Sequence, residues 1–292
     1  MIAVLQIAGS NLVEAGPIVI SGYLADTAGN DNPFEYVQLK ATQSIDFSVT
    51  PYSVVWASNG TASTNGWVEG FASSTSFTYG FDLSSGTVAP GGVFYVGGSG
   101  KTIDGSGSTD ISGQNWIRAI NTSTTGGDGG LGNASTAAGG VMGNGATADG
   151  LAVFGGPISS LTATTIPVDA LFYGTMVNTA LPPTPPGGGY TVSDNDHYSS
   201  SAVFGNPSSP NNTFLFPDTP TNGYTQLTGT YDLANNTWDV PRTGSIITLS
   251  KTSSLSSIDS QITLAVPEPS AFALGGACLL SLLNVRWHKN LL

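Results

Sequence analysis

The chain has 292 residues, with 19 Asp or Glu and 7 Lys or Arg, and its formal net charge is −12. No basic cluster lies within the first 285 residues, which argues against a nucleic-acid partner. Hydrophobic residues make up 39% of the chain, enough for a sizeable core, so wholesale disorder is excluded. Charged residues make up 9%, while 39 Gly and 17 Pro supply many turns, which favours an exported β-protein over a cytosolic enzyme.

The first 15 residues hold a weak apolar stretch at 2–8, with no Lys or Arg before it. A secretory signal needs a positive region, an apolar region and small residues before the cleavage site. Val-Glu-Ala at 13–15 satisfies the small-residue rule for cleavage before Gly16. We therefore interpret residues 1–15 as the remnant of a signal peptide, and the alternative is an ordinary first strand.

Short runs of β-branched and aromatic residues follow, broken by Gly, Pro, Asn and Ser, as in a sandwich or barrel. The pattern predicts strands at 17–23, 35–41, 52–57, 66–71, 91–98, 115–120, 149–156, 169–174, 212–217 and 245–250. Residues 226–241 are typical of a hairpin that turns at Asn235-Asn236, because Asn tolerates the positive φ of a tight turn. The predicted fold class is therefore all-β, an antiparallel β-sandwich.

Two stretches interrupt this pattern. Residues 122–147 are rich in Gly, Ala, Ser, Thr and Asn, which predicts a long Gly-rich loop or insertion. LPPTPPGGG at 181–189 has the composition of a linker, so 190–265 would be a second unit or would complete the first sandwich. We favour one elaborated domain over residues 16–265, with 181–189 as a candidate sub-boundary.

Several short sequence motifs follow one another along the first half of the chain. A Gly-Asn-Asp loop at 29–31 leads into Glu-Tyr-Val-Gln-Leu at 35–39, and Pro-Gly-Gly at 90–92 precedes a later strand. Asn-Gly and Asp-Gly pairs within 144–150 precede another strand. In this order, residues 17–174 resemble the lamin-tail domain.

The resemblance implies an immunoglobulin-like β-sandwich that serves as a binding or tethering module on bacterial surface proteins, often beside enzymes. Gln38 stands where an acid is usual in that family. Residues 55–80 and 103–140 look inserted, and nothing after about Gly174 carries a mark of the family.

The longest apolar run comes near the end of the chain. Residues 271–285 form a short transmembrane-helix candidate, since a span normally needs about 20 apolar residues. Arg286 and Lys289 follow and act as the membrane stop, because basic flanks stay cytoplasmic. This orientation leaves everything before Val266 outside.

Just before this run lies the sequence Val266, Pro267, Glu268, Pro269. The prolines cannot continue a helix, so they fix its outer boundary. Proline, acid, proline, apolar helix and basic stop, within residues 266–292, resemble the PEP-CTERM sorting signal of Gram-negative bacteria. The resemblance implies processing by an exosortase, a membrane-embedded cysteine transpeptidase. It also implies passage through the inner membrane to the cell surface or the extracellular matrix.

Few residues could carry catalysis. GGSGKT at 97–102 has Tyr95 where a phosphate-binding loop needs its first Gly, so it is not such a loop. The candidate bases are His197, Glu35 and Glu69, and no serine elbow accompanies them. The sequence therefore predicts no catalytic residues and no enzyme.

Metal chemistry is limited in the same way. Cys278 is the single cysteine, so the soluble part can form neither a disulfide nor a thiolate metal site. The oxygen-rich loops 26–31, 104–110 and 194–197 offer the ligands that Ca²⁺ prefers, although Asx-turns explain such loops without an ion. We expect no cofactor, with Ca²⁺ as the one candidate.

These observations predict an exported, non-enzymatic surface or matrix protein with a binding or tethering body. The alternative is a carbohydrate-binding or carbohydrate-active protein of the matrix, with extracellular polysaccharide as its partner. Tryptophans exposed in line on one flat face would favour the alternative; the candidates are Trp56, Trp67, Trp116 and Trp238.

Overall fold

The structure, a computed structural model, describes residues 16–31, 33–57, 67, 70–73, 76–120, 142–143, 149–162, 164–174 and 220–266. The regular elements in these ranges are strands, apart from two 3-10 turns, η1 (Ile158–Ser160) and η2 (Leu255–Ile258). The all-β class is thus confirmed. Among the described residues, no helix has the length and apolar character needed to cross a membrane.

The larger sheet has the order β13-β12-β1-β2-β8-β9, with β14 added beside β12. Its central strands, β1 and β2, are almost entirely buried, which matches their continuous runs of apolar residues. The seven strands are β1 (Ile18–Leu24), β2 (Tyr36–Ala41), β8 (Val93–Gly98), β9 (Trp116–Ile120), β12 (Gly223–Asp232), β13 (Thr237–Thr248) and β14 (Gln261–Ala265).

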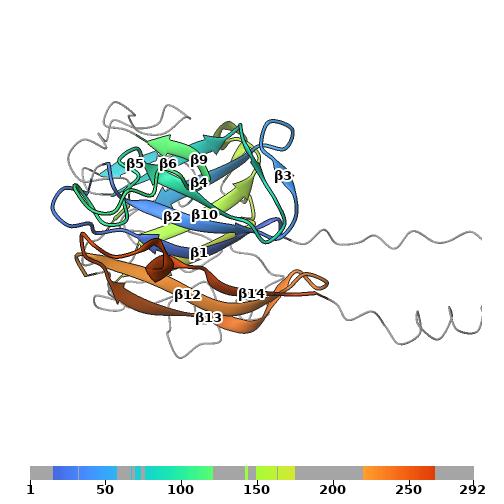
Figure 1. The fold of residues 1–292 in the computed structure, drawn as a ribbon. Coiled ribbons are helices and arrows are strands. Elements are labelled where there is room, and N and C mark those ends of the chain that lie inside the picture. Colours follow the sequence, from blue (N-terminus) through green and yellow to red (C-terminus); the bar gives the residue numbers. More distant parts are fainter. Residues whose placement is uncertain are drawn as a thin grey trace, which may run out of the picture.

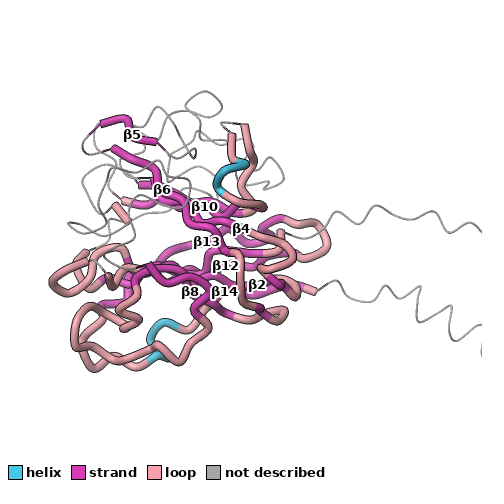
Figure 2. Tube along the Cα trace, turned by 90° about the horizontal axis from the view of Figure 1, so that it is seen from above, coloured by secondary structure: helices cyan, strands magenta, loops and turns pink. Residues whose placement is uncertain are grey.

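The second sheet has the order β11-β10-β4-β6-β5. Its members are β4 (Tyr52–Ala57), β5 (Gly70–Ser73), β6 (Ser76–Leu83), β10 (Asp149–Gly155) and β11 (Asp169–Tyr173). A small pair, β3 (Ile45–Asp46) with β7 (Thr87–Val88), lies at one edge of the molecule. Figure 1 looks onto the faces of the sheets, and Figure 2, seen from above, shows the two main sheets as two layers.

Side chains from both sheets form the inner core between the layers. Alternate residues of β2 and β10, such as Val37, Leu39, Leu151 and Val153, point into it, as the two-residue period of a strand requires. The outer faces are also buried: Trp67 and η1 cover the second sheet, and η2 with neighbouring loops covers the larger one. Three apolar layers therefore hold the sandwich-like body together.

The strands agree with much of the sequence-based prediction. The run 52–57 is a strand over its whole length, and the hairpin at Asn235-Asn236 joins β12 to β13. Asn236 has φ 56, the positive value expected for that turn. The predicted strand 212–217 lies outside the described residues.

Two expectations need correction. The pairing is not purely antiparallel, because β8 pairs β9 and β12 pairs β14 in parallel. Residues 55–80 are not simply an insertion, because β4 runs to Ala57 and β6 pairs with it along the middle of the second sheet. One Ser, one Thr and one Gly interrupt the apolar residues of β6, so the sequence pattern did not predict this strand. Strands on both sides of 181–189 share the larger sheet, since β1 pairs β12.

The sandwich has two distinct ends (Figure 1). The tail end holds Gly16, residues 46–51, the turn 232–237 and Val266: Gly16 N–H donates to the Asn236 side chain, and Leu233 N–H donates to the Ala265 carbonyl. The loop end, at the left of Figure 1, holds loops 25–35, 98–110, 220–223 and 249–258. The described part of the chain therefore begins and ends on the same side.

Candidate functional site

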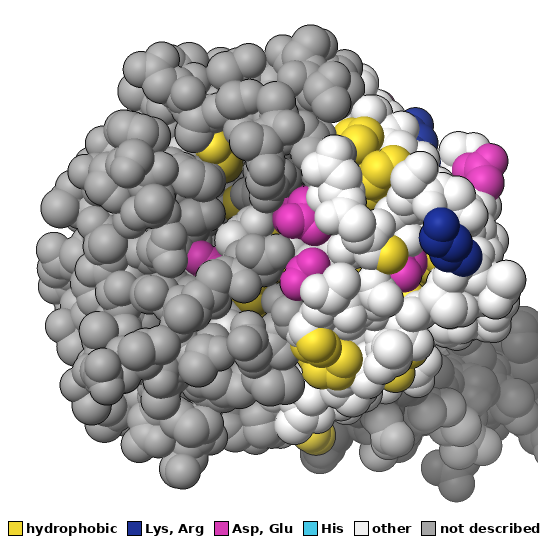
Figure 3. Space-filling view, turned by 90° about the vertical axis from the view of Figure 1, so that its left-hand side faces the viewer, with side chains coloured by type: hydrophobic (Ala, Val, Ile, Leu, Met, Phe, Trp, Pro, Cys, Tyr) yellow, Lys and Arg dark blue, Asp and Glu magenta, His cyan; other side chains and the backbone are white. Residues whose placement is uncertain are grey.

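The loop end gathers polar groups from segments far apart in the sequence. Figure 3 looks onto this end and shows acidic side chains lying close together on the visible face. Two groups of contacts organise it: one inside the mouth of the sandwich, and one where loop 25–35 meets loop 98–110.

The inner group contains two buried carboxylates. Glu35 precedes β2 and Asp149 begins β10, and each is 1% exposed. Every second side chain of a strand points to the same face, and by this spacing both acids point toward the inner core. Met142 N–H donates to Glu35 Oε2 at 3.0 Å, and the Cα of Gly143 lies so close to the Asp149 carboxylate that a Cβ there would overlap it. The backbone at 142–143 thus seals both acids from solvent.

Two tyrosines lie beside these acids. Tyr173 is the cross-strand partner of Asp149, and its ring packs against that of Tyr23 from the other sheet, with centroids 4.7 Å apart. Burial raises the pKa of both tyrosines, and Asp149 raises that of Tyr173 further. Both hydroxyls are therefore neutral at every physiological pH.

The outer group is built on the backbone of residues 26–28. Asp104 Oδ1 accepts a hydrogen bond from Ala28 N–H at 3.1 Å, so loop 98–110 is fastened to loop 25–35. Thr221 Oγ1 donates to Asp26 Oδ2 at 2.9 Å, and Asn222 N–H donates to the Asp26 carbonyl at 2.9 Å. Three loops therefore meet at one point.

Two oxygen atoms at this junction are buried without a hydrogen-bond partner, Asp104 Oδ2 and Asn222 Oδ1. Burial raises the pKa of the Asp104 carboxyl; the Ala28 N–H opposes this shift, and nearby Asp26 adds to it. Buried polar atoms without partners are costly, so native structures seldom retain them without a ligand, water or ion.

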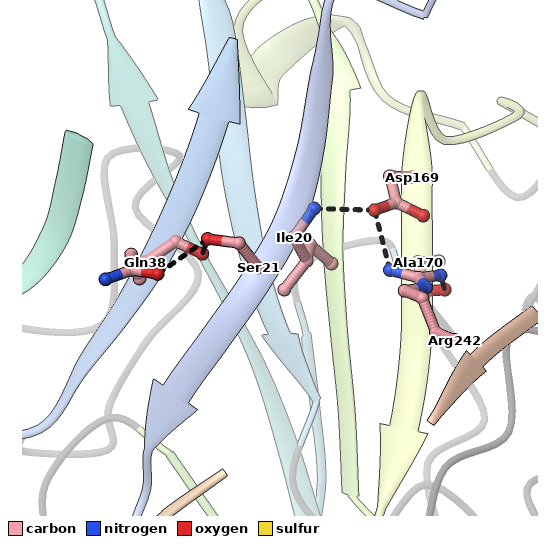
Figure 4. Close-up of polar contacts among 6 residues, drawn as sticks. All are labelled: Ile20, Ser21, Gln38, Asp169, Ala170 and Arg242. Atoms are coloured by element: carbon pink, nitrogen blue, oxygen red, sulfur yellow. Dashed lines mark hydrogen bonds and ion pairs between the residues drawn. The ribbon is translucent and has the colours of Figure 1, made fainter. Parts of the chain in front are cut away.

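A third polar group ties the two sheets together nearer the tail end. Asp169, at the start of β11, accepts from Ile20 N–H of β1 at 2.7 Å and from Arg242 of β13 at 2.8 Å (Figure 4). Arg242 also donates to the Ala170 carbonyl at 3.0 Å and lies over the Trp238 ring. These contacts are internal to the fold, and we assign them to stability.

The tryptophans do not form an exposed platform. Trp56, Trp67 and Trp238 are at most 2% exposed. Trp116 is half-buried, stacks on Tyr95 at 5.3 Å and has Lys101 over its ring. The flat aromatic face that would favour sugar binding is therefore absent from these four side chains.

The residues singled out from the sequence have different outcomes. Val266 follows β14 directly and is 73% exposed, while Pro267, Glu268, Pro269, Arg286 and Lys289 lie outside the described residues. The predicted transmembrane helix 271–285, His197, Glu69 and loop 194–197 lie outside them too. Glu35 is described, but its neighbour Asp149 was not anticipated, because 114 positions separate them in the sequence.

Comparisons with models of known protein families, with curated proteins and with solved structures gave no match.

Proposed function

We propose that this chain is an exported, non-enzymatic surface or extracellular-matrix protein that is sorted and processed through its C-terminal segment, and that its body is a binding or tethering module. Residues 1–15 would serve in export, and 266–292 would be a PEP-CTERM tail with a transmembrane helix at 271–285. An exosortase in the inner membrane would recognise and process that tail.

The observation that carries this proposal is the placement of the two ends of the body. Gly16 and Val266 lie at the tail end, so a tail anchored in a membrane or matrix leaves the opposite, loop end directed outward. Val266 is exposed and follows the last residue of β14, so the sorting motif begins immediately outside the folded body. A processing enzyme at the membrane surface needs an accessible target, and proline residues favour an extended backbone in the residue that precedes them.

We further infer that the two-sheet body is an immunoglobulin-like sandwich of the lamin-tail type. Its support is the position of Glu35-Tyr36-Val37-Gln38-Leu39: Glu35 directly precedes β2, and the other four residues lie on β2 in the centre of the larger sheet. Gln38 fits this buried position because it donates to Tyr95 Oη and the Ile258 carbonyl and accepts from Ser21 Oγ. An ionised acid there would lose those two donated bonds.

The proposal of a non-enzymatic body rests on accessibility. Glu35 and Asp149 contact two adjacent residues, Met142 and Gly143, and the backbone at 142–143 seals both acids. A polymeric substrate could not reach them without displacing that segment. The carbohydrate alternative loses its strongest support, since the tryptophans are packed inside the body or against Tyr95.

The test is to replace Pro267-Glu268-Pro269 by three alanines and express the full chain in a Gram-negative host that carries an exosortase. We expect the wild type to be shortened near 267–269 and to leave the inner membrane, and the variant to stay there at full length. Replacing Pro182 and Pro183 by alanine serves as the control, because it removes two prolines outside the motif. An intact C-terminus on surface-located wild type, measured by mass spectrometry, would show that the tail is a plain anchor.

A further inference from the structure

We propose that Asp26, Asp104 and Asn222 form a Ca²⁺ site at the loop end of the sandwich. This inference rests on contacts within the body and does not depend on the route of export or on the sorting tail.

The three residues come from three loops that are joined at one place. Asp104 reaches across from loop 98–110 to the Ala28 N–H. The Asn222 N–H donates a hydrogen bond to the Asp26 carbonyl, and the Thr221 hydroxyl donates one to an oxygen of the Asp26 carboxylate. The approach is close, because a Cβ at Gly105 would lie 2.5 Å from the Ala28 carbonyl oxygen. These contacts thus bring the three loops together before any ion binds.

The unsatisfied atoms point to a cation. Asp104 is 1% exposed, and its Oδ2 has no hydrogen-bond partner; Asn222 Oδ1 is also buried without one. Both atoms are acceptors, so a hydrogen-bond donor such as water or a cation can satisfy them, and a group that only accepts hydrogen bonds cannot. The nearby Asp26 carboxylate disfavours the charged form of Asp104, because the two negative charges repel each other. A bound cation would remove both penalties at once.

The Lys251 side chain does not take the place of such a cation. Lys251 is the nearest candidate, since its attraction lowers the pKa of Asp104, but this is the smallest of the four influences on that group. Lys251 is exposed, and it forms no ion pair with Asp104 in the described structure.

The ligand chemistry selects Ca²⁺ over other metals. The set contains oxygen atoms and no His or Cys, which disfavours Zn²⁺ and Cu²⁺. Among the described residues no three His, Cys, Asp or Glu side chains converge on one metal position, so the amide oxygen of Asn222 is needed. Ca²⁺ accepts amide, carbonyl and water oxygens in flexible geometry, whereas Mg²⁺ demands a near-ideal octahedron. Two carboxylates predict the weak affinity of an extracellular module, roughly 10⁻⁴–10⁻³ M.

Asn222 offers a clean way to test the site. Its φ is 65, a value that Gly adopts without strain, so Asn222→Gly removes the amide oxygen and keeps the backbone. Asp104→Asn removes the charge and keeps the acceptor for Ala28 N–H. Asp110→Asn is the matched control, because Asp110 lies in the same loop but is exposed and bonds to Ser112 N–H.

The experiment uses the full chain, freed of divalent ions by a chelator, and measures Ca²⁺ binding by calorimetry and Tb³⁺ binding by luminescence excited through tyrosine. Tyr36 is a suitable donor, because its hydroxyl bonds to the Ile103 carbonyl next to Asp104. We expect the wild type and Asp110→Asn to bind both ions, with Tb³⁺ displaced by Ca²⁺. Asp104→Asn and Asn222→Gly should each weaken binding by about tenfold or more. No binding by the wild type, or unchanged binding by Asn222→Gly and Asp104→Asn, would overturn the proposal.

Discussion

Asp169 and Asp104 are both buried aspartates, but they lie toward opposite ends of the sandwich and have different partners. Asp169, toward the tail end, has the Arg242 guanidinium at 2.8 Å and the Ile20 N–H at 2.7 Å. Asp104, at the loop end, has the Ala28 N–H on one oxygen and no partner on the other. The chain therefore supplies a counter-charge for one buried acid and leaves the other dependent on its surroundings.

This difference separates a structural role from a binding role. A buried charge destabilises a fold unless it is paired or becomes neutral. The Asp169–Arg242 pair satisfies this condition within the body and joins β11 of one sheet to β13 of the other. The loop end satisfies it with a proton or with an added cation, which is the property expected of a ligand site.

The largest expected effect comes from breaking the paired acid. Arg242→Met leaves Asp169 buried without its counter-charge and should destabilise the fold by about 3–5 kcal/mol, measured by urea unfolding. The double variant Asp169→Asn, Arg242→Met should recover part of this loss, because no uncompensated charge remains. A loss below about 1 kcal/mol in the single variant, a typical value for an exposed pair, would place the pair outside the core.

A smaller effect is expected from a glycine at the loop end. A Cβ at Gly98, the last residue of β8, would overlap the Pro33 carbonyl, which is backbone and cannot turn away. Gly98→Ala should therefore cost about 1–3 kcal/mol and displace loop 25–35, as overpacking does. Gly155→Ala is the control, because Gly155 ends β10 and a Cβ there meets nothing within 4 Å. Equal losses in the two variants would contradict the tight docking of loop 25–35.

The smallest effect concerns Asp104 in Ca²⁺-free buffer. Burial raises the pKa of this carboxyl above its unfolded value, so the charged form is the less stable one in the fold. The protonated Asp104 carboxyl therefore contributes to the stability of the fold at low pH, and this contribution is lost as the pH rises through the folded pKa of Asp104. The stability of the wild type relative to Asp104→Asn should therefore fall as the pH rises from below the unfolded pKa of Asp104 to above its raised folded pKa, by less than the loss in Arg242→Met, in denaturant titrations. A relative gain for the wild type over that range would show that Asp104 is already compensated.

Local patterns predicted much of this fold. The run at 52–57 has the β-branched and aromatic residues of a buried strand, and Asn236 adopts the positive φ that its residue type allows. The strands β6 and β14 were missed, since neither contains a concentrated apolar run. The parallel neighbours β8–β9 and β12–β14 could not be foreseen, because pairing depends on which distant segments meet.

The candidate sites show the same limit. Loops 26–31 and 104–110 were selected from their composition, and the structure joins them through the Asp104 contact with Ala28. The contribution of Asn222 follows from the pairing of β1 with β12, which no short motif encodes. The Glu35–Asp149 group depends in the same way on two sheets closing over each other.

The central claim is that the body is tethered at its tail end and presents its loop end outward. It is tested most directly on intact cells, in a Cys278→Ser background, with one cysteine placed at an exposed position of either end, Asn30→Cys or Val49→Cys. A bulky polyethylene-glycol maleimide is applied, and each rate is divided by the rate for the purified chain. We expect faster labelling of Asn30→Cys than of Val49→Cys. Equal labelling of the two, or labelling only after the cells are permeabilised, would contradict it.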